Sequence, residues 1–218
     1  MTELCELMKK HGSDKGDDWH NYTLVYSKMF AEYRDNAELV LEVGIGTNNP
    51  KFQSHMKPEY TPGGSLRGWR DWFSKALVYG VDIDPDIMIE DEERIVTFVA
   101  DQTDDMSLRD MWDRFDDDVV FDIIIDDGLH TLDAAATTFI QSIYMLADDG
   151  LYVIEDIQGH WGAAYKDEFA HLAMQTGLNF EYIEIPHATN KTDNNILVLW
   201  YGDSEKSNRA LESIKADA

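Results

Sequence analysis

The segment 121–156 constrains the fold more than any other part of the chain, because short apolar runs alternate in it with acidic turns. Residues 121–125 (Phe-Asp-Ile-Ile-Ile) are typical of a buried parallel strand, and acidic residues follow them directly. Residues 132–146 carry apolar side chains at helical spacing, and the acidic turn 148–150 ends this helix. A second strand, 151–154, again runs into acids. We therefore predict two parallel strands that place carboxylates at one sheet edge, where open α/β sheets bind ligands.

The rest of the chain continues this alternation of strands and helices. We expect an α/β, Rossmann-like, doubly wound sheet in one domain, 1–218, with 1–36 as an N-terminal extension of loop and helix. The predicted helices are 22–34, a helix that Ser65 caps, 104–115, 163–176 and a loose one from 204. The further predicted strands are 39–43, 77–82, 95–99, 180–185 and 196–201.

Composition limits the partners and the compartment. The 18 basic and 43 acidic residues give a net charge of −25, which disfavours nucleic acid because few cations would replace phosphate counterions. A well-solvated surface explains this charge most simply, and adaptation to high salt is an alternative. The single cysteine, Cys5, excludes an internal disulfide or thiolate cluster. The charged first ten residues and the strand-length apolar runs predict a cytoplasmic protein without a secretory signal or membrane span.

A glycine turn follows the first predicted strand. Gly44 and Gly46 would let the backbone approach a nucleotide or nucleoside closely, and Asn49 stands where a dinucleotide fingerprint has its third glycine. With Glu42 the pattern is Glu-x-Gly-x-Gly, which resembles the first motif of class I S-adenosylmethionine-dependent methyltransferases.

The acidic residues after the next predicted strand are of the kind that bind a nucleoside. Asp82 ends strand 77–82, where a carboxylate can accept hydrogen bonds from both ribose hydroxyls. We prefer it to Asp84, which we expect the following Pro85 to turn toward solvent.

Three further residues are candidates for cofactor binding. Arg67, near a helix start, could contact the cofactor carboxylate, or it is ordinary surface charge. By resemblance to the methyltransferases, Asp101 and Gln102 lie beside the adenine, with helix capping as the alternative.

The acidic residues of the segment 121–156 predict a metal site. Asp127, Glu155 and Asp156 would meet at neighbouring strand ends, so either they diverge into water or a hard divalent cation neutralises them. Oxygen ligands select Mg²⁺, Mn²⁺ or Ca²⁺ over zinc. His130 would lie one turn beyond, where it could take a proton from a coordinated hydroxyl, with helix capping or core packing as the alternative.

Five motifs occur in order: 41–46, 63–67, 79–84, 125–130 and 153–156. Over about 39–200 the chain resembles the metal-dependent O-methyltransferases of the macrolide-sugar and rhamnosyl group, which also includes proteins labelled cephalosporin hydroxylases. The resemblance implies seven strands with the last antiparallel, S-adenosylmethionine and Mg²⁺ (or Mn²⁺) as cofactors, and a sugar, glycoside or other polyhydroxylated small molecule as acceptor. It also implies Asp127, Glu155 and Asp156 as metal ligands and His130 as the base.

The acceptor cleft and the rival functions are less constrained. His20, Tyr22, His160 and Trp161 are candidates for the cleft, and core packing is the alternative for Tyr22. The rivals are a non-haem iron hydroxylase, disfavoured because its facial triad has two histidines, a nicotinamide oxidoreductase, and a catalytically silent binding module. The sequence is compatible with a homo-oligomer.

Overall fold

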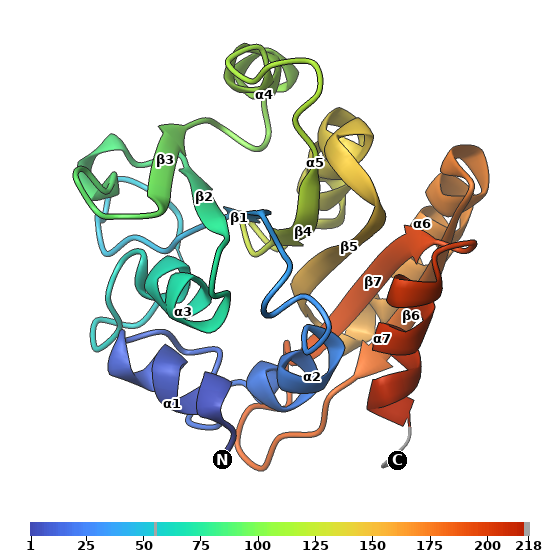
Figure 1. The fold of residues 1–218 in the computed structure, drawn as a ribbon. Coiled ribbons are helices and arrows are strands. Elements are labelled where there is room, and N and C mark those ends of the chain that lie inside the picture. Colours follow the sequence, from blue (N-terminus) through green and yellow to red (C-terminus); the bar gives the residue numbers. More distant parts are fainter. Residues whose placement is uncertain (55, 216–218) are drawn as a thin grey trace.

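A seven-stranded sheet runs through the computed structural model, which describes residues 1–54 and 56–215 (Figure 1). Its strand order is β3-β2-β1-β4-β5-β7-β6. The strands are β1 (Leu39–Val43), β2 (Leu77–Asp82), β3 (Ile95–Val99), β4 (Phe121–Asp126), β5 (Leu146–Ile157), β6 (Leu178–Glu184) and β7 (Asn195–Tyr201). The α-helices are α1 (Glu3–Lys10), α2 (Tyr22–Met29), α3 (Gly64–Trp72), α4 (Asp105–Trp112), α5 (Leu132–Ser142), α6 (Gly162–Thr176) and α7 (Glu205–Lys215).

Strand directions confirm the predicted fold class. β1 to β5 are parallel, and β7 is antiparallel to both of its neighbours, β5 and β6. The chain builds outward from β1 to β3 and then returns to β4 on the other side of β1. The order therefore reverses between β1 and β4, which is the topological switch point where open α/β sheets bind ligands.

Two apolar layers cover the two faces of the sheet. Helices α1, α2, α3 and α7 pack on one face, where Tyr26 and Trp69 are fully buried (Figure 1). Helices α4, α5 and α6 pack on the other, around Phe139 and Phe169. Successive β1 side chains alternate between these layers, as the period of two in a strand requires. Within the described part of the chain, no helix has the length and apolarity needed to cross a membrane.

Several helices and strands begin or end at residues other than those predicted. Helix α2 ends at Met29, short of the predicted residue 34, and α3 begins at Gly64 with Gly63 as its N-cap, so Ser65 is not the cap. Helix α5 stops at Ser142, and a short 3-10 turn (Ile143–Met145) leads into β5. The predicted turn at 148–150 lies inside β5, because Leu146 already pairs with Phe121 of β4 and this pairing overrides the local turn signal.

Glycine at position 44 is required by both backbone angle and space. Gly44 has φ +85°, and a Cβ there would lie 2.1 Å from the carbonyl oxygen of Asp127. Gly177 has φ +75° but nothing within 4 Å of an added Cβ. Comparing substitutions at Gly44 and Gly177 therefore separates the effect of backbone strain from the effect of steric overlap.

We expect Gly44→Ala to lower the free energy of unfolding by about 3 kcal/mol, because left-handed strain adds to overpacking against backbone. Gly177→Ala should lower the free energy of unfolding by only about 1 kcal/mol, since only the left-handed backbone strain applies there. Urea denaturation followed by circular dichroism measures both. Equal losses for the two variants would contradict the close approach of β1 and β4.

Candidate functional site

A cavity of about 460 Å³ opens at the switch point. The carboxyl ends of β1, β2, β4 and β5 form its floor, and the segments 12–22, 43–54 and 56–61 contribute to its walls. The predicted edge of the sheet is therefore hollowed, and most of the candidate residues surround this cavity.

The glycine turn forms one end of the cavity. Gly44 donates its N–H to the carbonyl of Val81 on β2, and Gly46 has φ +79°. The N–H of Ile45 donates to Oδ2 of Asp82 over 2.9 Å, so the turn is held against the end of β2. Both predicted glycines line the cavity, and neither position has space for a Cβ, because the Asp127 carbonyl packs against Gly44 and the Met56 sulfur against Gly46.

Asp82 lines the cavity, whereas the prediction for Asp84 is wrong. Asp82 also accepts a 3.1 Å hydrogen bond from the N–H of Asp84, and burial raises the pKa of the Asp82 carboxyl. Asp84 is fully buried and accepts a 2.5 Å hydrogen bond from the Thr47 hydroxyl. It holds the loop that follows the glycine turn, because Asn49 also donates to it, and so it does not point to solvent.

Asp101 and Gln102 both line the cavity. The Gln102 amide donates to Oδ1 of Asp126 over 2.6 Å and accepts from the N–H of Leu129 over 2.7 Å, which joins the segment after β3 to the end of β4. The N-cap of α4 is Asp104, so helix capping does not explain Asp101.

Besides Glu42, which was predicted to bind the cofactor and is buried outside the cavity lining, three of the predicted residues do not reach the cavity. Arg67 makes a two-pronged contact with Glu92 and donates to the carbonyl of Pro62, so its guanidinium is engaged at the helix surface. His160 and Trp161 lie in a short 3-10 turn, and Trp161 is 52% exposed. Among the described residues, these three are outside the cavity lining.

Acidic side chains gather at the ends of β1, β4 and β5. Asp127 directly follows β4, while Glu155 and Asp156 lie inside β5, where the pairing with β7 is irregular between Ile154 and Ile157. Asp156 has φ +53°, so the strand turns sharply there and aims two consecutive carboxylates at the cavity edge. With Glu42 of β1 these residues form what we call the carboxylate cluster: Glu42, Asp127, Glu155 and Asp156.

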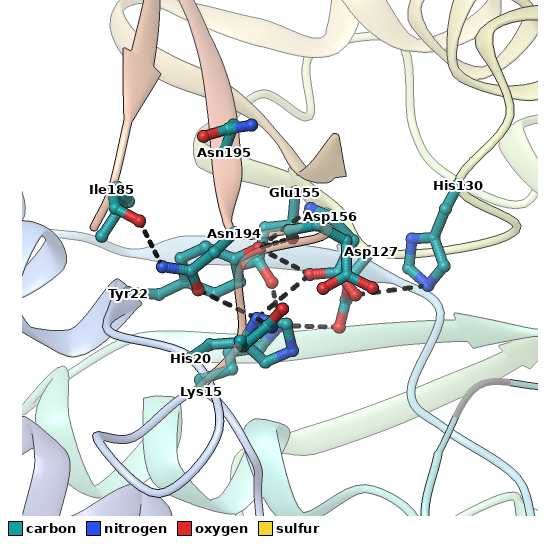
Figure 2. Close-up of polar contacts among 12 residues, drawn as sticks. Lys15, His20, Tyr22, Asp127, His130, Glu155, Asp156, Ile185, Asn194 and Asn195 are labelled. Atoms are coloured by element: carbon teal, nitrogen blue, oxygen red, sulfur yellow. Dashed lines mark hydrogen bonds and ion pairs between the residues drawn. The ribbon is translucent and has the colours of Figure 1, made fainter. Parts of the chain in front are cut away.

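One part of the cluster faces His130. Ligand atoms of Asp127, Asp156 and His130 lie within 4.8 Å of one another, and Nε2 of His130 is 3.6 Å from Oδ2 of Asp156 (Figure 2). His130 has φ +58° and precedes Thr131, the N-cap of α5. This backbone turn presents the imidazole to the carboxylates, as predicted from its place after β4.

The other part of the cluster faces Lys15, which the sequence analysis missed. The Lys15 ammonium lies 2.5 Å from Oε2 of Glu155, 2.7 Å from Oδ2 of Asp127 and 3.1 Å from Oε1 of Glu42. Its side chain is only 2% exposed. Burial alone would lower the pKa of Lys15, but attraction to the three carboxylates outweighs it and raises the pKa well above its ordinary value.

Helix α2 supplies two more contacts to the cluster. The Tyr22 hydroxyl donates to Oδ1 of Asp156 over 2.6 Å, and the Tyr26 hydroxyl donates to Oε1 of Glu155 over 2.7 Å. His20 stacks on Tyr22, and its Nδ1 is 3.6 Å from Oδ1 of Asp156. His20 and Tyr22 line the cavity, so these two acceptor-cleft candidates lie where they were predicted. Tyr26 lies four residues after Tyr22, so the sequence already indicated that the two tyrosines share one face of the helix.

Burial disfavours the charged forms of the acidic side chains in and beside this cluster. It raises the pKa of Asp156 to about 7 and that of Asp126 to about 6, and it raises the pKa of Glu155 against the opposing effect of Lys15. The charged forms are costly in a poorly hydrated site unless cations or hydrogen bonds compensate them. Carboxylate oxygens converging beside one imidazole fit a hard divalent ion such as Mg²⁺ or Mn²⁺.

Comparison with known proteins finds relatives that are O-methyltransferases. The chain is 42% identical over 171 residues to 8-demethyl-8-alpha-L-rhamnosyl tetracenomycin-C 2'-O-methyltransferase of Streptomyces olivaceus, covering 76% of this chain and 41% of that protein. It is 38% identical over 155 residues to demethylmacrocin O-methyltransferase of Streptomyces fradiae, covering 71% and 36%. The chain thus spans less than half the length of these relatives. No protein-family model matches it.

A solved structure extends the match in three dimensions. MycE methyltransferase from the mycinamycin biosynthetic pathway, in complex with Mg and SAH, has a TM-score of 0.69 and 26% identity, and the match covers 94% of this chain and 56% of that one. Human methyltransferase-like protein 13 in complex with SAH, at 15% identity and a TM-score of 0.57, shares the fold.

The hydrogen bond from Tyr26 to Glu155 can be tested by removing one atom. We expect Tyr26→Phe to lower the free energy of unfolding by about 2 kcal/mol, because a buried charged acceptor loses its donor. Tyr33→Phe is the matched control: this buried tyrosine donates to the backbone carbonyl of Asp149, a neutral acceptor, and should lose about 1 kcal/mol. Urea denaturation compares the two, and a smaller loss at Tyr26 would contradict an ionised Glu155.

Proposed function

Because the chain belongs to the class I S-adenosylmethionine-dependent methyltransferases, we propose that it methylates a hydroxyl of a sugar or other polyhydroxylated small molecule with the help of Mg²⁺ or Mn²⁺. The observation that carries this proposal is the placement of Asp127, Asp156 and His130 at the mouth of a cavity that begins at the glycine turn. Methyl donor, metal ligands and base would then share one edge of the sheet.

The cofactor would occupy the end of the cavity beside β1 and β2. Its methionine part would lie against the backbone of Gly44 and Gly46, Asp82 would bind the ribose hydroxyls, and Asp101 with Gln102 would contact the adenine. Glu42 lies behind the turn, where Oε2 accepts a 2.6 Å hydrogen bond from Ser65, so we assign it to supporting the turn. Arg67 has no part in this proposal, since Glu92 engages it.

The metal would bind at the carboxylate cluster. Asp127 and Asp156 are the ligands whose oxygens already converge with His130. Glu155 would be the third ligand, since a carboxylate that accepts hydrogen bonds from Lys15 and Tyr26 still has lone pairs for an ion. When bound, the ion supplies positive charge that lowers the pKa of a neighbouring hydroxyl.

The transfer itself is a displacement at the methyl carbon. The acceptor oxygen forms a bond to the methyl carbon as the bond from that carbon to the sulfonium sulfur breaks, which leaves S-adenosylhomocysteine and a methyl ether. His130 takes the proton that the hydroxyl loses. Asp156, 3.6 Å away, stabilises the resulting imidazolium.

Titration calorimetry tests the binding steps. We expect the chain to bind S-adenosylmethionine, then Mg²⁺, and to turn over a glycoside acceptor only when the ion is present. Asp127→Asn should weaken Mg²⁺ binding at least tenfold, because a charged oxygen ligand becomes a neutral amide, and should leave cofactor binding within about threefold. No heat with S-adenosylmethionine would overturn the proposal, and cofactor binding without turnover of any acceptor would favour a silent binding module.

Substitution of His130 tests the base. We expect His130→Gln to lower the rate of methyl transfer about 10²- to 10⁴-fold, the usual contribution of general base catalysis, while Mn²⁺ and cofactor affinities change little. His171→Gln is the control, because His171 is exposed on α6 and pairs with Gln175. Single-turnover measurement of the methylated product separates the chemical step from binding, and an unchanged rate would exclude His130 as the base.

A further inference from the structure

Lys15 is the one buried ammonium in contact with the carboxylate cluster in the described part of the chain, and the proposed transfer gives it no step. Its three contacts reach three neighbouring strands: Glu42 on β1, Asp127 after β4, and Glu155 on β5. Lys15 donates hydrogen bonds to Asp127 and Glu155, and its contact with Glu42 is an ion pair at 3.1 Å. Such a residue fixes the relative positions of the carboxylates it joins.

The backbone of Lys15 is itself held in place. Its N–H donates to the Ser13 hydroxyl over 3.3 Å, and its carbonyl accepts from the N–H of Thr23 in the first turn of α2 over 3.2 Å. Figure 2 shows the Lys15 side chain directed at the cluster beside His20. A lysine side chain otherwise carries large rotational freedom, so burial and these anchors restrict it to one arrangement.

One ammonium does not replace the divalent ion. The cluster holds four carboxyl groups and one ammonium, so its oxygens outnumber the donors that Lys15 can offer, and a divalent cation can still bind among them. Lys15 contacts Oδ2 of Asp127 and Oε2 of Glu155, and each carboxylate has about four lone-pair positions in all. The contacts therefore orient both groups and leave them able to bind an ion.

We infer that Lys15 is a positioning residue, which holds Asp127 and Glu155 in the orientation that the divalent ion requires. This inference rests on the proposed metal-dependent function. Lys15 acts through the ligands, in the way that hydrogen-bond partners of ligating side chains orient them and tune metal affinity. It does not contact the acceptor or the methyl group in this role.

Binding of Mn²⁺ measured by electron paramagnetic resonance tests the inference without any turnover. We expect Lys15→Met in the full chain to weaken Mn²⁺ binding about 10- to 100-fold, the usual cost of losing a partner of a metal ligand. Lys206→Met is the matched control, because Lys206 also lies between two carboxylates, 3.1 Å from Asp149 and 4.0 Å from Asp122, at the opposite end of the strands. It should change the affinity by less than about twofold, since it removes the same charge far from the site.

Lys15→Arg keeps the charge and covers the case in which Lys15→Met does not fold. A guanidinium cannot make the same three contacts in this space, so its Mn²⁺ affinity should fall between those of wild type and Lys15→Met. Equal or tighter binding in folded Lys15→Met, or wild-type affinity in Lys15→Arg, would overturn the inference and show Lys15 as a competitor or a purely structural group. Failure of the wild-type chain to bind Mn²⁺ would instead overturn the proposed metal site, and this inference with it.

Discussion

Attraction between the Lys15 ammonium and the carboxylates of three strands is the interaction on which the site depends. Parallel strands bring their carboxyl ends to one edge, and here three of those ends carry an acid into a nearly dry environment. Like charges at this spacing repel strongly unless a cation lies among them. Lys15 supplies that cation from a different part of the chain and offsets the repulsion among Glu42, Asp127 and Glu155.

The switch point gives this charge arrangement a place to act. Because the strand order reverses between β1 and β4, the connections that leave these two strands run to opposite sides, and the cavity opens at their ends. The glycine turn keeps that gap narrow, since the Asp127 carbonyl packs against Gly44 where any other residue would place a Cβ. Asp127 is thereby fixed beside the glycine turn, which brings the proposed metal ligand next to the end of the cavity proposed for the cofactor.

Local signals predicted the sheet and the floor of the site, but not the contacts made over long sequence distances. Strand-like runs and the acids after them specified β1 to β5, the glycine turn and the placement of Asp127 and His130. Lys15 lies 112 and 140 residues from Asp127 and Glu155, within a polar segment that reads as a loop, so no period or motif marked it. The two interpretations of Arg67 could not be separated for a similar reason, because its partner Glu92 belongs to a connector with no regular pattern.

Residues 1–36 contribute four side chains to the site. Lys15, His20, Tyr22 and Tyr26 all come from residues 1–36, and each meets a carboxylate of β4 or β5. One face of α2 packs into the core beside Trp69, while its tyrosine hydroxyls reach the cluster, so apolar burial and charge compensation come from the same helix. The strands alone would expose acids that repel one another. The side chains from residues 1–36 therefore bring an ammonium and hydroxyl donors to the acidic strand ends, and they hold the carboxylates in one orientation.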